Sequence, residues 1–416
     1  MKTLTKCTLS AAVAAIIATN AAQAAEVVTV DPSLKLTYKN FNWQEDYGSG
    51  VSNERDEWVH GVIADFDTGY VNDVIGAVVT TGAVFPLDVQ KGSSMANVAK
   101  DSRGDADSIG GFQQVYLKAK HTAGDVNLNA SYGVKKRGFE LYGNSGSRVL
   151  AASSEGFDVS AAYGDLNVYA SRLTGASNRN QSALTRDIMQ DGNKIDNILI
   201  YGANYSIAGV GLVAEQLKSQ DYLKKGFLMA SYGLELSEGM GIDLDARYGT
   251  AKRDGNLVPA GYKSKYVNLN ATLNVANAFV GIGYNKTKDG DWNRNNGSGN
   301  SDVFNSSLDL WDQFANEGEK AYLLTAGYNF ADLGLPGLSV DVTTAKGKDA
   351  KGFSKFDRRE FSGNVSYSFS GDLEGLSVAW YHYDYKLDER ADGATATDKT
   401  KENGDRVYLT YSVSVF

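Results

Sequence analysis

The chain has little of three residue types that often build a functional site or a covalent framework. It has 416 residues but only one cysteine, four prolines and three histidines. The cysteine, Cys7, lies in an N-terminal segment that we expect to be removed, so the mature chain has no disulfide and no cysteine-based zinc site. His60, His121 and His382 fall in separate predicted strands, which argues against a metal site. We therefore expect no metal and no other cofactor.

Long hydrophobic runs are also missing. No apolar run after the N-terminal segment approaches the roughly 18 residues that a transmembrane helix requires. The scarcity of proline, together with 24 tyrosines, favours long continuous strands, because proline removes a donor from a strand ladder. No Pro-rich or Ser-rich linker divides the chain, so we expect a single domain over residues 25–416.

The N-terminus has the organisation of a secretory signal peptide. Lys2 and Lys6 precede an apolar stretch over residues 9–18, and the small residues Ala22 and Ala24 follow. This order predicts a cleaved signal peptide over residues 1–24 and export from the cytoplasm. Without the two lysines, 39 basic residues face 50 acidic ones, a net charge of −11, which argues against a nucleic-acid partner.

Apolar and polar residues alternate along most of the chain, as in residues 126–135, 242–248 and 267–275. Side chains on a strand point alternately to its two faces, so each segment has one apolar and one polar face. We count about 18 such segments. They are residues 34–43, 58–66, 74–85, 113–121, 126–135, 157–163, 166–173, 198–205, 210–217, 227–236, 242–250, 266–275, 278–286, 321–330, 338–345, 361–369, 376–385 and 406–415.

The connections between these segments alternate in length. Short turns, such as residues 123–125 and 164–165, alternate with long connections, which are residues 86–111, 136–156, 174–197, 287–320 and 387–405. Sorting of this kind is typical of an outer-membrane barrel with short periplasmic turns and long extracellular loops. The bilayer also requires closure, because an open sheet edge would leave backbone groups unpaired in hydrocarbon. We predict an all-β fold, a closed antiparallel transmembrane barrel in the outer membrane of a Gram-negative bacterium.

Several stretches resemble the OprD family of outer-membrane porins. They are residues 53–61 (Asn-Glu-Arg-Asp-Glu-Trp-Val-His-Gly), 147–157, 314–338, 359–361 and 371–377. The resemblance implies an 18-stranded, substrate-selective diffusion channel. It also implies that residues 136–155 are a third extracellular loop that folds inward and narrows the pore. The terminal Phe416 is typical of chains that are delivered to the barrel assembly machinery.

One departure from the family bears on the solute. Many members carry arginines of a basic pore ladder where this chain has Ala379 and Tyr381, and Tyr383 and Tyr385 follow with the same parity. Tyrosines suit the apolar faces of sugar rings. Residues 308–311 (Leu-Asp-Leu-Trp) are similar to a run in chitooligosaccharide-uptake porins of the same broad family. These features favour a sugar or an oligosaccharide.

The polar face of the strands predicts the pore lining. Early strands supply mostly basic residues, middle strands more acidic ones, and the C-terminal strands tyrosines, so a transverse field would orient dipolar solutes. We expect weak ion selectivity and a preference for neutral or amino sugars over small carboxylates; a generic polar wall without a binding site is the alternative. The predicted pore-lining residues are Lys35, Lys39, Tyr116, Lys118, Lys120, Arg148, Asp243, Asp245, Arg247, Tyr381, Tyr383 and Tyr408.

The sequence therefore predicts a passive porin for small hydrophilic solutes. A channel for amino acids or small carboxylates is the nearest alternative, and an outer-membrane enzyme or adhesin belongs to a different class. No catalytic constellation stands out, so we expect no enzymatic activity. The expected partners are the solutes, outer-membrane lipid and lipopolysaccharide, and the barrel assembly machinery through the C-terminal strand. The chain would be a monomer or a loose trimer.

Overall fold

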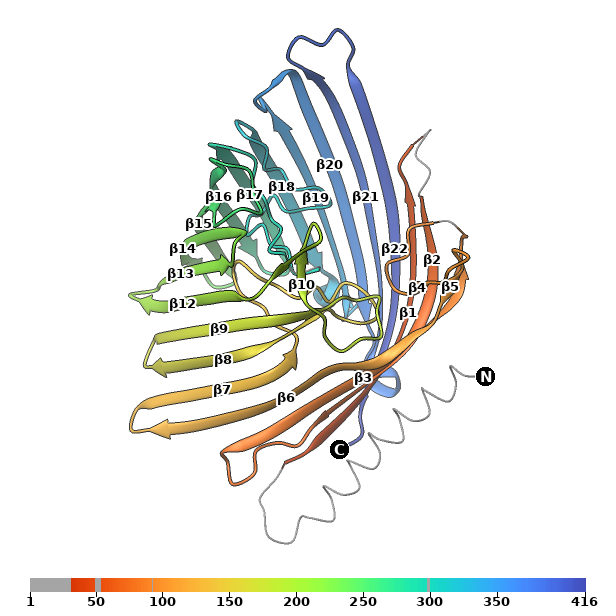
Figure 1. Cartoon of the computed structure of the whole chain (residues 1–416), viewed down its shortest axis with the longest axis vertical. Coiled ribbons are helices and arrows are strands. Elements are labelled where there is room, and N and C mark those ends of the chain that lie inside the picture. Colours follow the sequence, from red (N-terminus) through yellow and green to blue (C-terminus); the bar gives the residue numbers. More distant parts are fainter. Residues whose placement is uncertain (1–30, 49–53, 92, 298–299) are drawn as a thin grey trace.

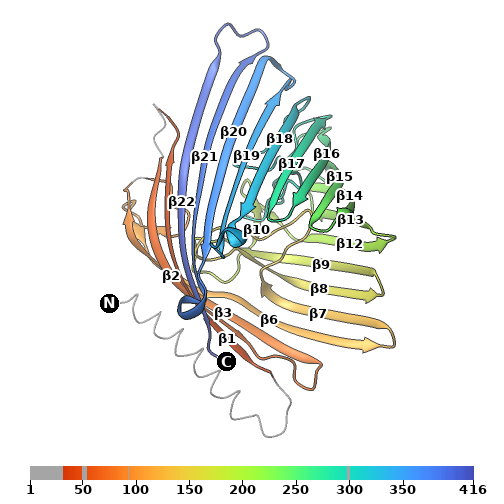
Figure 2. The ribbon, with the colours of Figure 1, turned by 180° about the vertical axis from the view of Figure 1, so that it is seen from behind.

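A computed structural model describes residues 31–48, 54–91, 93–297 and 300–416, so the predicted signal peptide lies outside the described residues. The chain forms an 18-stranded antiparallel sheet that closes into a barrel (Figures 1 and 2). Its strands are β1 (Ser33–Asp46), β2 (Arg55–Asp67), β3 (Ile75–Val89), β6 (Ile109–Ala123), β7 (Val126–Lys135), β8 (Ser153–Tyr163), β9 (Leu166–Ser177), β12 (Ile198–Ile207), β13 (Val210–Ser219), β14 (Leu223–Ser237), β15 (Met240–Arg253), β16 (Lys263–Val275), β17 (Ala278–Lys288), β18 (Lys320–Asn329), β19 (Leu338–Lys348), β20 (Phe353–Ser368), β21 (Leu376–Ala391) and β22 (Asp398–Ser414).

Closure depends on pairing between the first and last strands. β1 and β22 pair antiparallel from Lys35 opposite Ser414 to Asp46 opposite Asn403. Beyond the ladder, the Leu34 amide donates to the Phe416 carbonyl at 3.1 Å. The barrel and its strand number confirm the fold prediction. No helix in the described part of the chain is long and apolar enough to cross a membrane.

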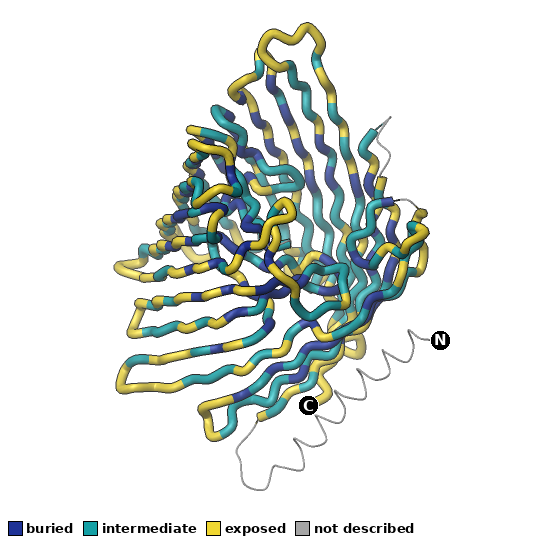
Figure 3. Tube along the Cα trace, viewed as in Figure 1, coloured by how far each residue is buried: buried dark blue, intermediate teal, exposed yellow. Residues whose placement is uncertain are grey.

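Alternation along the strands is also present in the structure. On β16, Val267 and Leu269 are exposed on the outer face, whereas Tyr266 and Asn268 are buried on the inner face. Figure 3 shows the same alternation of burial along most strands. Because the outer face meets lipid, its apolar side chains need no protein partner.

Long and short connections alternate as predicted, with one error. Residues 90–108, 136–152, 178–197 and 289–319 are long connections on the extracellular side, and they include the short hairpins β4–β5 (Ala99–Lys100, Ala106–Asp107) and β10–β11 (Ile188–Gln190, Asn193–Ile195). The periplasmic turns are short, and two contain the 3₁₀ turns η1 (Phe330–Leu333) and η2 (Gly371–Leu373). The prediction of a long loop over residues 387–405 is wrong, because β21 and β22 continue to Ala391 and from Asp398.

The physical reason for this error is the position of those strand ends. Above the hydrocarbon core the outer face of a strand meets polar headgroups or water and the inner face meets water, so the apolar half of the alternation disappears while the backbone ladder continues. Lys386 pairs with Lys401, and Asp388 with Lys399, in regular register. A search for alternating apolar residues therefore stops at the membrane surface, not at the strand end.

Candidate functional site: a basic and aromatic constriction

Three loops fold into the barrel, and a buried carboxylate of the wall holds each of them. Glu57 on β2 accepts the amide of Asn97 at 2.9 Å and that of Ala96 at 3.1 Å. Glu215 on β13 accepts the amides of Leu141 and Glu140 at 2.7 and 3.1 Å. Charged acceptors make the stronger class of hydrogen bond, so these contacts fix the loops against the wall.

The third anchor has the same form on another strand of the wall. Glu360 on β20 accepts the amides of Trp311 and Asp312 at 2.7 and 3.2 Å. The loop of residues 289–319 is held further by Lys225 of β14, whose ammonium donates to the carbonyls of Arg294 and Asn295 at 2.9 and 3.0 Å. The interior is therefore partly filled by ordered loops.

The loop of residues 136–152 also packs through apolar side chains. Its Leu141 is buried in one cluster with Phe227 of the wall, and its Val149 and Leu150 are buried in a second cluster with Trp43. The prediction that this loop folds inward is confirmed, although the loop ends at residue 152 and β8 begins at Ser153.

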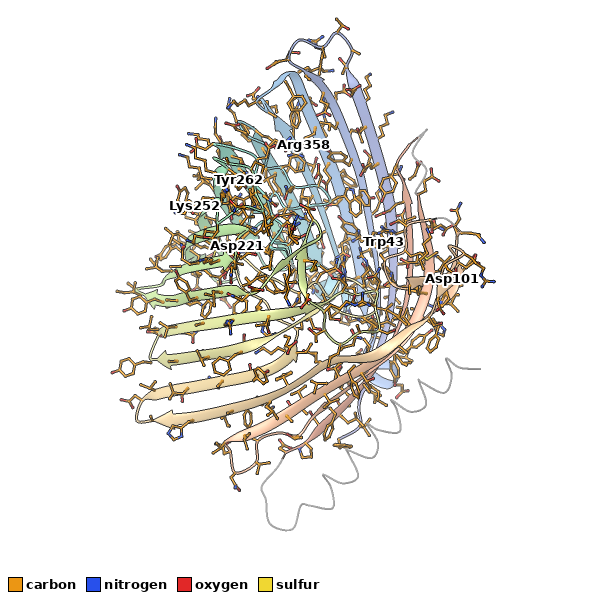
Figure 4. All side chains as sticks on the ribbon, viewed as in Figure 1. Trp43, Asp101, Asp221, Lys252, Tyr262 and Arg358 are labelled. Atoms are coloured by element: carbon orange, nitrogen blue, oxygen red, sulfur yellow. The ribbon has the colours of Figure 1, made fainter. Side chains whose placement is uncertain are left out.

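Trp43 of β1 lies where this loop meets the wall, and it organises the basic groups of the site. The guanidinium carbons of Arg148, Arg55 and Arg406 lie 3.7, 3.8 and 4.2 Å from its ring centroid. They come from the loop, β2 and β22, and Trp43, labelled in Figure 4, is nearly fully buried among them. Cation–π contacts of this kind are stronger when water is excluded.

The cluster around Trp43 carries more positive than negative charge. Arg179, from residues 178–197, is linked to the same loop through Ser145 and Ser147, each at 2.9 Å. In the described part of the chain, the carboxylate within 4 Å of these four arginines is Glu45, at 3.6 Å from Arg55 and 3.8 Å from Arg406. Burial, and then repulsion from the other guanidinium groups, lowers the pKa of the loop residues Arg148 and Arg179.

Several donors in this cluster have no acceptor. The Nε groups of Arg148, Arg179 and Arg406, the indole Nε1 of Trp43 and the hydroxyl of Tyr383 are buried without a hydrogen-bond partner. The Oε1 of Glu45, an acceptor in the same cluster, is also buried without a partner, so unpaired donors outnumber unpaired acceptors here.

Aromatic rings border the arginines. Trp311 stacks on Tyr383 with centroids 4.0 Å apart, and Tyr381 lies 6.3 Å from Tyr383. On the other side Tyr408 lies 4.5 Å from Phe41. Tyr381 and Tyr408 remain partly exposed. Tyr383 is covered by Trp311, so it supports the site rather than lining open space.

The structure brings only some of the predicted pore residues together here. Arg148, Tyr381, Tyr383 and Tyr408 belong to the cluster around Trp43, and the Lys39 ammonium donates to the Arg148 carbonyl at 3.4 Å. The functional role of these residues stays a prediction.

A second group of predicted residues lies lower on the early strands. Tyr116 and Lys118 line a cavity of about 390 Å³ beneath the loop of residues 136–152. Lys118 is paired with Asp67 at 2.6 Å, and Lys120 is paired with Asp73. The Tyr70 ring lies 4.4 Å from the Lys118 ammonium. These pairs neutralise much of the predicted basic wall.

The remaining predicted residues lie away from the constriction. Asp245 accepts from Arg247 at 2.7 Å, and Arg247 donates to Asn305 of the inward loop at 2.9 Å, so this pair positions a loop. Asp243 accepts from Asn274 at 2.7 Å, and Lys35 lies opposite Asp65 near the periplasmic end. No group of three or more His, Cys, Asp or Glu residues that could hold a metal occurs among the described residues.

Sequence reasoning missed four residues of the site: Trp43, Arg55, Arg179 and Arg406. The alternation along the strands was sufficient to indicate two of them. Trp43 faces inward like Lys39, and Arg406 faces inward like Tyr408. The alternation carried no signal for Arg179, because it comes from a long irregular segment.

Comparison with known proteins agrees with this geometry. The family model described as "outer membrane porin, OprD family" matches residues 29–415. The chain belongs to the OprD family. A similar protein, Porin D of Pseudomonas aeruginosa, is 22% identical over 363 residues, which cover 82% of this chain and 79% of that protein.

Solved structures of similar fold lie within the OprD group. OpdK of Pseudomonas aeruginosa with vanillate superposes with a TM-score of 0.77 at 20% identity, covering 92% of this chain and 99% of that one. OccK2 of the same species with glucuronate gives 0.74 at 20% identity, covering 93% and 99%. OccAB2 of Acinetobacter baumannii gives 0.78 at 19% identity, covering 93% and 98%. These likenesses concern the fold.

Membership of the OprD family gives the general function and location. The chain is a porin of the Gram-negative outer membrane and a substrate-selective diffusion channel for small hydrophilic solutes. The cluster around Trp43 is a place where the wall and the inward loop of residues 136–152 meet.

Proposed function

We propose that this porin selects solutes that carry a carboxylate on a ring, and that it passes them by diffusion without catalysis. The supporting observation is the cluster around Trp43, where four arginines face one nearby carboxylate, Glu45, among the described residues. A carboxylate would restore the charge balance and could accept hydrogen bonds from the guanidinium groups.

The neighbouring rings would contact the body of the solute. Tyr381 lies 5.5 Å from the Arg406 guanidinium, and Tyr408 is adjacent to Arg148 through the Ser147 carbonyl at 3.5 Å. A ring held by its carboxylate at the arginines could therefore stack on a tyrosine face. The excess positive charge would also raise the local concentration of anionic solutes.

Two structural relatives are consistent with this choice. Vanillate and glucuronate, named with OpdK and OccK2, each combine a ring with a carboxylate. The expectation of a sugar rather than a small carboxylate is based on Ala379 and Tyr381, which replace arginines of a basic ladder. In this chain arginines reach the constriction from β2, β22 and two loops instead.

A neutral or amino sugar remains the second candidate, since the partly exposed Tyr381 and Tyr408 suit a sugar ring without a charge. The two candidates differ in what they require of the arginines. A carboxylate needs the positive charge, whereas a neutral sugar does not.

Reversal potentials in planar bilayers under a salt gradient test the proposal. We expect the wild-type channel to prefer anions, and the double substitution Arg148→Gln and Arg406→Gln to remove most of that preference. The matched control neutralises Arg103 and Arg172, two exposed arginines outside the cluster around Trp43. A wild-type channel without anion preference, or a double variant that keeps it, would contradict the proposal.

A further inference from the structure

Basic side chains form a belt on the outer face of the barrel. They lie at the extracellular ends of β13 to β22, where the strands leave the apolar zone. Lys252, labelled in Figure 4, lies at the end of β15. The belt comprises Lys218, Lys224, Lys252, Lys263, Lys265, Lys286, Lys288, Lys320, Lys346, Lys348, Lys355, Arg359, Lys386, Arg390, Lys399 and Lys401.

Strand register places these side chains on the lipid-facing side. Lys286 pairs with Val267, and Val267 is exposed on the outer face. The neighbours of Lys286 on its own strand, Asn285 and Thr287, are fully buried on the inner face. Residues that pair directly across two strands share a face. The same argument therefore places the belt residues of each neighbouring strand on the outer face.

On β17 and β18 the belt lies at the height of lipid headgroups. Tyr284 and Tyr322 pack together on the outer face with centroids 5.2 Å apart. Lys286 and Lys320 lie two residues further toward the extracellular side, about 6–7 Å above the rings at strand rise. Aromatic residues prefer the membrane interface, so the cations just above them meet the charged part of the outer leaflet.

In the belt, side chains of like charge lie directly opposite each other on neighbouring strands. Direct cross-strand pairs of like charge are destabilising unless another charge compensates them. In the ladder they occur repeatedly: Lys218 with Lys224, Lys224 with Lys252, Lys252 with Lys263, Lys265 with Lys288, Lys286 with Lys320, Lys320 with Lys348, Lys346 with Arg359, Arg359 with Lys386, Lys386 with Lys401 and Lys355 with Arg390.

The protein supplies only part of the compensating charge. Asp254, Asp289 and Asp349 pair with Lys224, Lys265 and Lys320 at 2.8 to 3.0 Å. Asp357, Asp384 and Asp388 pair with Lys346, Lys386 and Lys355 at 2.8 to 3.1 Å. Several other belt lysines have no carboxylate within 4 Å among the residues that the structure describes. These are Lys252, Lys263, Lys286, Lys288, Lys348, Lys399 and Lys401.

The belt is confined to one side and contrasts with the rest of the chain. The corresponding outward positions of β1 and β2 carry Asn40, Asn42, Trp58 and His60. The whole sequence has a formal net charge of −9, so a contiguous basic surface does not follow from its composition. Such a surface indicates a partner with regularly spaced negative charge at headgroup level.

We propose that the belt binds the phosphate groups of lipopolysaccharide in the outer leaflet. These phosphates lie at the interface, and several lysines from adjacent strands can surround each of them. The ammonium groups are exposed on long stems, so they can reach the headgroups while their methylenes cover the apolar wall. The inference does not depend on which solute crosses the pore.

Binding of lipopolysaccharide to the purified full-length porin in detergent tests this proposal. The test variant combines Lys252→Gln, Lys286→Gln and Lys348→Gln. The matched control combines Lys91→Gln, Lys100→Gln and Lys194→Gln, which remove the same charge from exposed lysines outside the belt. We expect the test variant to bind at least about tenfold more weakly, because each cation near an anionic lipid surface contributes substantially, and the control to bind like the wild type.

Two further measurements test whether the phosphate groups of lipopolysaccharide cause the binding. Dephosphorylated lipopolysaccharide should bind the wild type as weakly as intact lipopolysaccharide binds the test variant, and inorganic phosphate alone should not compete at equal concentration. Heat-modifiable migration and unchanged single-channel conductance would show that the variant barrel is folded. Equal affinity of wild type and folded test variant, undiminished binding of the dephosphorylated lipid, or displacement by inorganic phosphate would overturn the proposal.

Discussion

At the scale of single residues, the site depends on Trp43. Its ring holds guanidinium groups from three separate elements within 4.2 Å of its centroid. Like charges would otherwise separate, because burial strengthens their repulsion. Trp43 therefore positions the arginines rather than contacting the solute, which agrees with its near-complete burial.

Replacing this ring should loosen the arginine cluster. In Trp43→Ala, three cation–π contacts worth about 0.5–2 kcal/mol each are lost, and a cavity replaces the indole. We expect higher conductance and lower anion selectivity in single-channel recordings, and Trp43→Phe should retain much of both properties. Trp58→Ala removes an exposed, lipid-facing tryptophan and serves as the control. Conductance and selectivity unaffected by Trp43→Ala would show that the constriction lies elsewhere.

At the scale of elements, strands could be predicted from the sequence but loop positions could not. A strand such as β16 is encoded locally, since each apolar residue follows a polar one across residues 267–275. The inward loop is fixed by contacts distant in sequence, such as the bond from the Leu141 amide to Glu215. No local pattern encodes such a contact, and only the resemblance to a family indicated it.

The buried carboxylate anchors lead to a prediction about gating. Glu215→Gln keeps the shape of the side chain but removes the charge that strengthens its bonds to the two loop amides. The loop of residues 136–152 should then leave the wall more often, which would appear as more frequent current fluctuations. Glu235→Gln, which alters an exposed carboxylate near the periplasmic end of β14, should leave the record unchanged. Equally quiet currents in both variants would mean that apolar packing alone holds the loop.

Removing the tip of this loop tests its role in pore size. Deletion of residues 139–148 leaves β7 and β8 paired while taking away Leu141, Tyr142 and Arg148. We expect a several-fold larger conductance together with reduced anion selectivity. Unchanged conductance would place the narrowest point among residues 289–319 instead.

At the scale of the whole molecule, closure joins the two ends of the described chain. The last strand pairs with the first along nearly its whole length, and the bonds between Leu34 and residues 415–416 continue the pairing to the C-terminus. In a bilayer an unpaired edge is excluded, so these final residues contribute to the stability of the entire barrel.

Removal of the last two residues should therefore impair assembly more than it changes the pore. A chain that ends at residue 414 loses its terminal aromatic residue and two backbone bonds to Leu34. We expect a lower yield of heat-modifiable barrel in outer membranes and normal conductance of those channels that do assemble. Phe416→Tyr keeps an aromatic terminus and should restore the yield. Wild-type yield of the truncated chain would argue against a role of this terminus in recognition by the assembly machinery.

The central claim, selection of a ring-bearing carboxylate, is tested most directly by uptake of matched solutes into proteoliposomes. Glucuronate should enter faster than glucose, and benzoate faster than benzamide, and Arg148→Gln combined with Arg406→Gln should abolish both differences. Faster entry of the neutral member of each pair, or differences that persist in the double variant, would contradict the claim and favour the neutral-sugar channel.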